Sequence, residues 1–242
     1  MSNIAVLNNV DHKELRIITS RSAVYGDDVN CAITFPAEFR NLQANYPIVF
    51  GQEPETGQFV PLALFGFTRG QNLFLKDDGW DANYIPLVVE RQPFLIGVPQ
   101  VSDAVDGSRG PVIHVDMDSP RISHDDGERV FLAHGGISEY LDHVNSVLKT
   151  INDGLIVGEA FAKVLQEQGL LEPFSLDVEL NDGSQNRMAG YHTINEQKLA
   201  GMSGDELASL HQHGYLMAIY MVIASMSNLR ALIDRQNALL EQ

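Results

Sequence analysis

The residue types most suited to chemistry occur in the run HVDMD at 114–118. On a β-strand, alternate side chains point to the same face, so His114 and Asp116 would lie together, with Asp118 beyond them. A His-x-Asp pair joined by a distant histidine is the donor set of an iron site, and His192 supplies that histidine on another predicted strand. The sequence thus allows a divalent metal such as iron at His114, Asp116 and His192. The plainer interpretation is the solvated face of an amphipathic strand.

A second candidate group follows the turn DDG at 77–79, where Trp80, Asp81 and Tyr84 are close in sequence. Aromatic rings beside a carboxylate on a loop can line a pocket for a small molecule or a peptide. The same rings can instead close the end of a hydrophobic core. We therefore name these three residues as candidate ligand-binding residues and keep the core-capping alternative open.

Common catalytic signatures are missing from the sequence. It contains no G-x-G-x-x-G fingerprint, no P-loop, no H-E-x-x-H motif and no G-x-S-x-G nucleophile elbow. The single cysteine, Cys31, lies in the apolar run CAITF, so we expect a buried, unreactive thiol. We assign no catalytic residue and no cofactor, and we favour a binding or accessory protein over a metal-dependent enzyme.

The composition is that of an acidic globular protein. Its 242 residues are 44% hydrophobic, enough to bury a core, and carry a formal net charge of −16. Such a charge repels phosphate backbones and anionic lipid, so we expect no nucleic acid among the partners, although solubility alone would also explain it. One cysteine excludes an intrachain disulfide.

The sequence offers no obvious route to a membrane. The N-terminal stretch MSNIAVLNNVDHKELR has no basic segment followed by an apolar one, so it does not resemble a Sec signal. The longest apolar run, 215–226, has 12 residues, which is too short to span a bilayer. We expect no transmembrane segment and a cytoplasmic location, with the cell surface, reached by a non-Sec route, as the alternative.

The elements that would position these residues begin with short strands. We predict them at 14–20, 30–35, 47–52, 59–67, 72–75, 94–98 and 111–117. A PETG turn joins the third and fourth strands into a hairpin, and the strand at 72–75 would extend it to a meander. One helix is predicted over 36–46, with Pro36 in its first turn, and another from Asp81, as its N-cap, through Arg91.

Longer elements occupy the second half. Helical spacing of apolar residues predicts a helix over 136–168, in which Gly154 and Gly158 bend it or allow close packing and Gly169 is the C-cap. The NDGS sequence at 181–184, between two strand-like runs, predicts a second hairpin. Two short helices follow, one beginning at Asn195 and one with a capping box of Ser203 and Glu206.

The last helix, predicted over 215–240, begins with YLMAIYMVIASM, which is apolar on nearly every side. Such a helix is buried in the core or in a subunit interface, so we expect a partner protein or a second copy of the chain to bind through it. Because strands pair locally as hairpins, the fold class is α+β, with antiparallel hairpins, a long central helix and a long buried C-terminal helix. We expect one domain over 1–242, in which the segment 100–130 is the place for a subdivision.

Several stretches resemble the SapC family of bacterial proteins. They are FPAEFRNLQANYPIVF at 35–50, PETGQFVPLALFGF at 54–67, NLFLKDDGWDANYIP at 72–86, LLEPFSLDVELNDG at 170–183 and YHTINEQKLAGMSGDEL at 191–207. The resemblance covers nearly the whole chain, but the family supplies no established catalytic motif. It does not extend to the peptide-transporter permease of the same name, which is a membrane protein.

What the resemblance implies is context rather than mechanism. The family name comes from a protein associated with a bacterial surface layer (S-layer). Similar members occur beside tryptophan-halogenase-like proteins, cupin-like proteins and TonB-dependent receptors. The missing catalytic set and the apolar C-terminal helix favour a soluble accessory module that acts with a partner, and the family name adds a surface-layer component as an alternative.

Overall fold

The computed structural model describes residues 3–97 and 112–241, which fall into two compact units. Unit 1 comprises Met1–Asp27 and Leu87–Asp153, and unit 2 comprises Asp28–Pro86 and Gly154–Gln242. The long helix α3 (Glu139–Glu167) contributes residues to both. The expected subdivision near 100–130 includes residues 100–111, which lie outside the described part of the chain.

Unit 1 is built on two small antiparallel sheets with the strand orders β1-β9-β8 and β10-β2-β11. Its elements are β1 (Ile4–Val6), β2 (Arg16–Ile17), the 3-10 helix η1 (Ala23–Tyr25), α2 (Leu87–Glu90), β8 (Phe94–Gly97), β9 (Val112–Asp116), β10 (Ile122–Ser123) and β11 (Glu128–Arg129). The first half of α3 closes the core. Buried together there are Leu15, Ile17, Phe94, Val115, Val130, Leu141, Val144 and Leu148.

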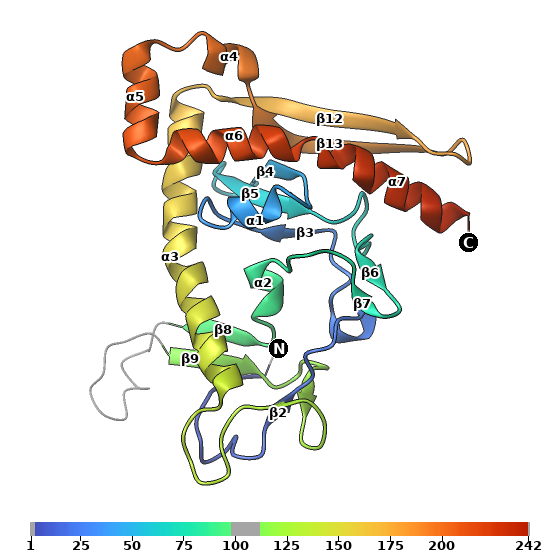
Figure 1. The fold of residues 1–242 in the computed structure, drawn as a ribbon, viewed down its shortest axis with the longest axis vertical. Coiled ribbons are helices and arrows are strands. Elements are labelled where there is room, and N and C mark those ends of the chain that lie inside the picture. Colours follow the sequence, from blue (N-terminus) through green and yellow to red (C-terminus); the bar gives the residue numbers. More distant parts are fainter. Residues whose placement is uncertain (1–2, 98–111, 242) are drawn as a thin grey trace. The chain divides into compact units, whose positions relative to one another are not determined.

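Unit 2 is built on a five-stranded antiparallel sheet with the order β12-β13-β4-β5-β3 (Figure 1). The strands of this sheet are β3 (Cys31–Ile33), β4 (Ile48–Gln52), β5 (Phe59–Leu64), β12 (Leu171–Glu179) and β13 (Gln185–Ile194). Two further strands of unit 2, β6 (Leu75–Lys76) and β7 (Gly79–Trp80), pair with each other as a two-stranded sheet. Its helices, besides the second half of α3, are α1 (Phe39–Leu42), α4 (Glu196–Ala200), α5 (Gly204–Gln212), α6 (Tyr215–Ser225) and α7 (Asn228–Leu240). Helix α6 packs on β4, β13 and α1.

The two hairpins of unit 2 and the capping box of α5 match their predictions, and the fold is α+β as expected. Strands β4 and β5 form the first hairpin, with Gln52 opposite Phe59. Strands β12 and β13 form the second around Gly183, whose φ of 81° is the left-handed conformation that glycine adopts readily. The capping box of α5 is present, because Ser203 and Glu206 bond each other's backbone N–H groups.

Two predictions between residues 72 and 91 were wrong. The strand at 72–75 does not extend the first hairpin; instead β6 pairs with β7 across the turn at 77–78, as a separate two-stranded sheet. The helix expected from Asp81 is reduced to the single turn of α2. Asp81 does not cap a helix; its carboxylate pairs with Arg235 at 2.7 Å.

The last helix is interrupted between α6 and α7, at Met226 and Ser227. Ser225 Oγ donates to the carbonyl of Val222 at 2.6 Å and accepts a hydrogen bond from the backbone N–H of Ile48 at 2.9 Å. Ser227 Oγ donates to the carbonyl of Ala224. Serine hydroxyls that bond carbonyls of the preceding turn compete with the helical ladder, which gives a physical reason for the break.

Candidate functional site

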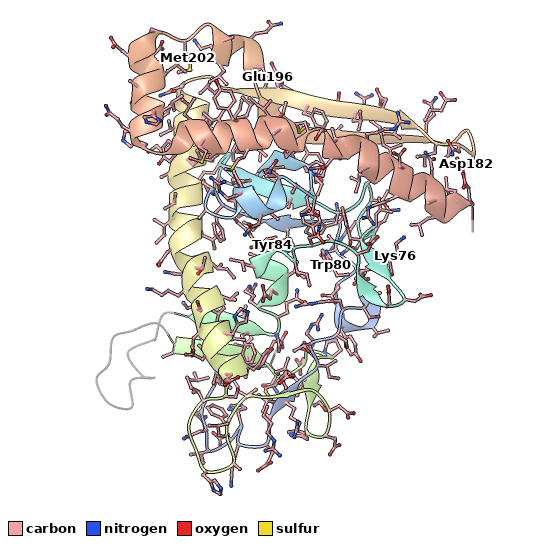
Figure 2. The ribbon with its side chains drawn as sticks, in the orientation of Figure 1. Lys76, Trp80, Tyr84, Asp182, Glu196 and Met202 are labelled. Carbon is pink, nitrogen blue, oxygen red and sulfur yellow. The ribbon has the colours of Figure 1, made fainter. Side chains whose placement is uncertain are left out.

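Trp80 stands at the end of β7 and is fixed from both sides in unit 2 (Figure 2). Its indole Nε1 donates to the hydroxyl of Tyr46 at 2.7 Å, and its ring packs edge-on to Phe65 with centroids 5.3 Å apart. The Tyr46 hydroxyl in turn donates to the backbone carbonyl of Tyr84 at 2.5 Å. Burial raises the pKa of Tyr46, so this hydroxyl stays a neutral donor.

Tyr84 anchors the loop that follows Trp80 (Figure 2). Its hydroxyl donates to Glu38 Oε1 at 3.0 Å, while Thr34 Oγ1 donates to Glu38 Oε2 at 2.7 Å. Glu38 is buried, and these bonds replace the water that its carboxylate loses. Trp80 and Tyr84 therefore belong to one hydrogen-bond network that runs through Tyr46, and the Tyr84–Glu38 bond holds the loop in place.

Asp81 meets a residue that sequence reasoning missed, Arg235 of α7. The Arg235 guanidinium donates to the Asp81 carboxylate at 2.7 Å and to the Asp81 carbonyl at 3.0 Å. It also lies over the ring of Phe74, 4.3 Å from the ring centre, which is a cation–π distance. A planar guanidinium held on two sides is a fixed group rather than a mobile surface charge.

These side chains border a pocket of about 410 Å³ in unit 2. Its lining is Ala44, Asn45, Phe74, Trp80, Asp81, Ala82, Asn83, Asn228, Ala231 and Arg235. The structure thus brings Trp80 and Asp81 together with amide and guanidinium groups, which suits hydrogen bonding to a polar ligand. The amphipathic pattern of the last helix was the one sequence feature that could have pointed to Asn228 and Arg235.

His114 and Asp116, two residues of the hypothetical metal site, lie on β9 of unit 1. The His114 ring packs against Gly97 of β8, where a Cβ added to the glycine would lie 2.3 Å from His114 Cε1. Asp116 borders a cavity of about 340 Å³ together with Asp118 and Arg91. Asp118 itself lies beyond the end of β9 and accepts a hydrogen bond from the Asn3 backbone N–H.

His192, the third proposed ligand, lies on β13 of unit 2, opposite Phe50 of β4. Its ring packs edge-on to Phe59 with centroids 4.7 Å apart, and its Nδ1 is buried without a hydrogen-bond partner among the described residues. Burial lowers the pKa of His192, because the charged imidazolium would lose its hydration. The histidine is therefore held as a neutral ring beside an aromatic neighbour.

The metal hypothesis gains no support from this arrangement. Across residues 3–97 and 112–241, no three His, Cys, Asp or Glu side chains are grouped so that they could hold a metal ion. His114 and Asp116 belong to unit 1, whereas His192 belongs to unit 2. The site at His114, Asp116 and His192 stays a prediction from spacing alone.

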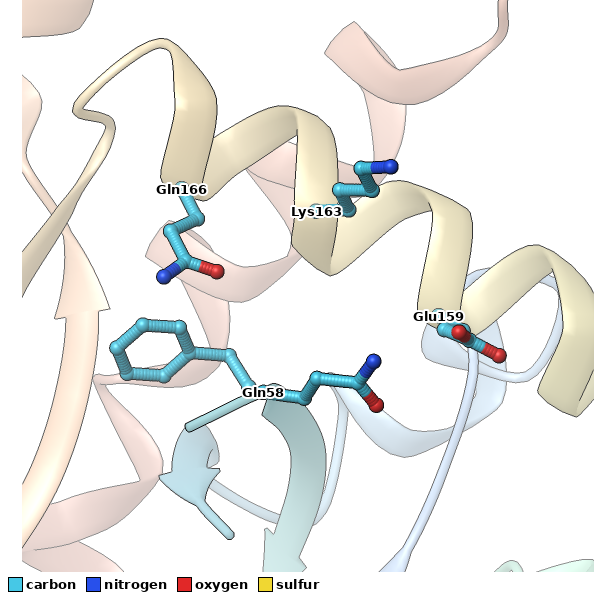
Figure 3. Close-up of a pocket in the computed structure, with 5 residues that line it drawn as sticks. Gln58, Glu159, Lys163 and Gln166 are labelled. Atoms are coloured by element: carbon cyan, nitrogen blue, oxygen red, sulfur yellow. The ribbon is translucent and has the colours of Figure 1, made fainter. Parts of the chain in front are cut away.

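A further pocket, of about 210 Å³, lies between α3 and the start of β5 in unit 2 (Figure 3). Gln58, Phe59, Glu159, Lys163 and Gln166 line it. An adjoining pocket of about 180 Å³ shares Gln58, Phe59 and Glu159 with it. The lining combines one aromatic ring with opposite charges, and it offers no converging set of nucleophile and base.

Sequence reasoning also missed a cluster of arginines in unit 1. Arg21, Arg91 and Arg121 border one small cavity, although they stand far apart in the sequence. Arg121 is among the largest fully buried side chains of the chain. Lone arginines separated by 30 residues or more carry no spacing pattern, so nothing in the sequence pointed to this cluster.

Helix α6 is apolar on both faces, and only one face is covered. Its buried side carries Ala218, Ile219, Val222 and Ser225, while Met217 and Tyr220 are 57% and 55% exposed. By length and composition, the 26 residues Tyr215–Leu240 could also cross a membrane, with a mean hydropathy of 1.6 in the most apolar window. The expectation from the sequence rested on the uninterrupted apolar run 215–226 alone and so did not consider this longer helix. One such helix is weak evidence for a membrane span.

Fold and pockets together define an α+β protein with open antiparallel sheets and several small polar pockets. A family model described as SapC matches residues 7–232, and the chain therefore belongs to the SapC family. The match runs through both units. No curated protein and no solved structure matched the chain in the same comparisons.

Proposed function

We propose that this SapC-family chain is a non-catalytic binding module that acts with a partner protein, and that the partner docks on the exposed face of α6. Four residues form this docking face: Met217, Tyr220, Met221 and Ala224. Their spacing of i, i+3, i+4 and i+7 places them in one stripe of the helix. This apolar stripe, in which Met217, Tyr220 and Ala224 are exposed and Met221 is half-buried, is the observation that carries the proposal, because exposed apolar surface marks interaction sites.

The charge of the chain favours a different protein over a second copy as the partner. Two copies would each bring a formal net charge of −16, and their mutual repulsion opposes self-association. Helix α6 itself has no charged residue in its 11 positions, and the side chain of Arg40 contacts Met217 Sδ of the face at 3.4 Å. The face therefore suits an apolar surface of a partner that is less acidic.

The test is native mass spectrometry of the untagged chain purified from its own host, with and without substitutions. We expect a complex with one different protein that is lost in Tyr220→Glu, because a charge at the centre of an apolar contact must be desolvated. The matched control is Val10→Glu, which changes an exposed apolar residue (81%) outside the docking face. That control should keep the complex, and circular dichroism should show both variants folded.

Three outcomes would overturn the proposal. A mass equal to that of the chain alone would show that no partner is bound. A simple multiple of the chain mass would show that the chain binds a second copy of itself instead. A complex that persists in the Tyr220→Glu variant would show that the partner binds outside the docking face. We also propose a cytoplasmic location for the module, and recovery of the chain in the membrane fraction would contradict that location.

A second candidate function is ligand binding at the pocket bordered by Trp80 and Asp81. The observation that favours it is the fixed Arg235 guanidinium, which leaves a charged donor at the pocket wall beside an aromatic ring. Trp80 is the only tryptophan of the chain, so its fluorescence reports on this pocket alone. Titration with free amino acids and dipeptides should change the emission in the native chain and leave it unchanged in Arg235→Gln; constant emission with every probe would reject this candidate.

A further inference from the structure

Unit 1 contains a cavity of about 110 Å³ whose wall is unusually rich in arginine for an acidic protein. Arg21, Arg91 and Arg121 line it, together with the Tyr140 ring and the aliphatic side chains of Val144 and Val147 from α3. All of these residues belong to unit 1, so the cavity lies within a single compact unit.

Arg121 is the most deeply buried of the three, at 1% exposure. Its Nη1 donates to the carbonyls of Ile18 and Ser20, both at 2.9 Å, and its Nη2 donates to Asp27 at 2.6 Å. Its Nε–H is buried without a partner among the described residues. A buried guanidinium donor without an acceptor is costly, and a bound acceptor would remove that cost.

Arg21 and Arg91 are held in place by other bonds. Arg21 donates to Asp27 at 3.3 Å and to the carbonyl of Val89 at 3.2 Å. Arg91 donates to the carbonyl of Phe94 at 2.6 Å, and burial lowers the pKa of its guanidinium. The pKa of Arg21 is also lowered, first by burial and then by the nearby charge of Arg121. The positive charges of Arg21 and Arg121 thus repel each other.

Three arginines and one carboxylate, that of Glu90, line this cavity, so its wall carries more positive than negative charge. Counting Asp27 as well, which pairs with Arg21 and Arg121, the three guanidiniums face two carboxylates. Glu90 is itself bonded to His143 at 2.7 Å. Two other carboxylates of unit 1, those of Asp116 and Asp118, border the separate cavity that Arg91 also touches. One additional negative charge beside the three arginines would therefore be attracted rather than repelled.

We propose that this cavity binds a small carboxylate. A planar carboxylate matches the fork of a guanidinium and can accept two parallel hydrogen bonds from it. Val144 and Val147 give the wall an apolar side, which suits the aliphatic end of a short carboxylic acid better than an inorganic phosphate with oxygens on every side. The small volume limits the ligand to a few heavy atoms.

Isothermal titration calorimetry on the full chain tests the proposal, with acetate, propionate and butyrate as carboxylate probes and inorganic phosphate as the competing anion. Ionic strength is held constant with chloride. We expect saturable binding of at least one carboxylate with a stoichiometry near one. Arg91→Gln should weaken it about 10- to 100-fold, the loss expected for a hydrogen bond to a charged group.

The control variant is Arg129→Gln, which removes an exposed arginine of the same unit that does not line the cavity. It should bind the carboxylate as the native chain does. The absence of saturable binding for every probe would overturn the proposal. Phosphate binding as tightly as the carboxylates would overturn the ligand class, and equal binding by native chain and Arg91→Gln would overturn the location. None of these results depends on the partner that docks at α6.

Discussion

Arg121 and Asp27 form an ion pair inside unit 1, with Nη2 and Oδ2 2.6 Å apart and side chains that are 1% and 0% exposed. Asp27 Oδ2 also accepts a hydrogen bond from the Ser22 backbone N–H at 2.9 Å. Both charges are therefore bonded rather than hydrated. Removing Arg121 leaves the buried Asp27 carboxylate with the longer pair to Arg21 at 3.3 Å and the Ser22 N–H, which costs more than the intact pair contributes.

We therefore expect Arg121→Met to lower the free energy of unfolding by about 3–5 kcal/mol. Arg129→Met is the control, because Arg129 and Glu14 form an exposed pair at 3.8 Å that should contribute about 0–1 kcal/mol. Urea unfolding followed by circular dichroism measures both. Similar losses in the two variants would contradict the burial argument.

Gly154 lets α3 approach the buried ring of Phe35, since a Cβ at Gly154 would lie 2.3 Å from Phe35 Cδ2. At Gly158, one turn later, the same atom would lie 3.4 Å from Phe35 Cβ. We expect Gly154→Ala to be less stable than Gly158→Ala by about 1–3 kcal/mol, because only the first forces the core apart. Thermal unfolding compares the two, and equal midpoints would count against the close approach.

Ser203 caps α5, accepting a hydrogen bond from the Glu206 backbone N–H, while the Glu206 carboxylate accepts one from the Ser203 N–H at 2.8 Å. Ser203→Ala removes an acceptor for the first turn and should cost about 0.5–2 kcal/mol. Ser203→Thr keeps the hydroxyl, which also donates to the Glu206 carboxylate at 2.7 Å, and should cost much less. Chemical denaturation measures both variants, and equal losses would show that the cap contributes nothing.

His192 should titrate below the ordinary histidine pKa of about 6.5, because burial penalises its charged form. The unfolded chain then binds the proton more readily than the folded one. The contribution of His192 to stability is present above the unfolded pKa and is lost as pH falls through the folded pKa. NMR titration of the ring gives the pKa directly, and a value above 6.5 would refute this.

A second readout for His192 is the pH dependence of unfolding. On acidification from pH 7.5 to about 5.5, the native chain should lose more stability than His192→Gln, which has no proton to take up in this range. All other residues are the same in the two proteins, so the difference isolates His192. Equal losses of stability in the native chain and in His192→Gln would contradict the assignment of this pH dependence to His192.

Much of the fold could be predicted because its causes are local. The turn sequences PETG and NDGS fix the two hairpins of unit 2, and Ser203 with Glu206 fixes the start of α5. Gly169 has a φ of 64°, as its C-cap role after α3 requires. In each case neighbours in sequence make the deciding contact, so the pattern alone was sufficient.

The sites could be predicted only in part, because their partners come from distant segments. Trp80 and Asp81 were named from their own sequence, but Arg235, which holds Asp81, lies 154 positions away. The helix expected from Asp81 begins only at Leu87. The spacing of His114, Asp116 and His192 could not show that the histidines belong to different units.

By itself, then, the sequence determined the class of fold, the family, the acidic charge and the turns and caps, since these depend on composition or on residues a few positions apart. The tertiary structure decided which face of α6 is covered and which three arginines share a cavity. Burial and charge pairing depend on contacts between segments far apart along the chain, and no local periodicity records those contacts.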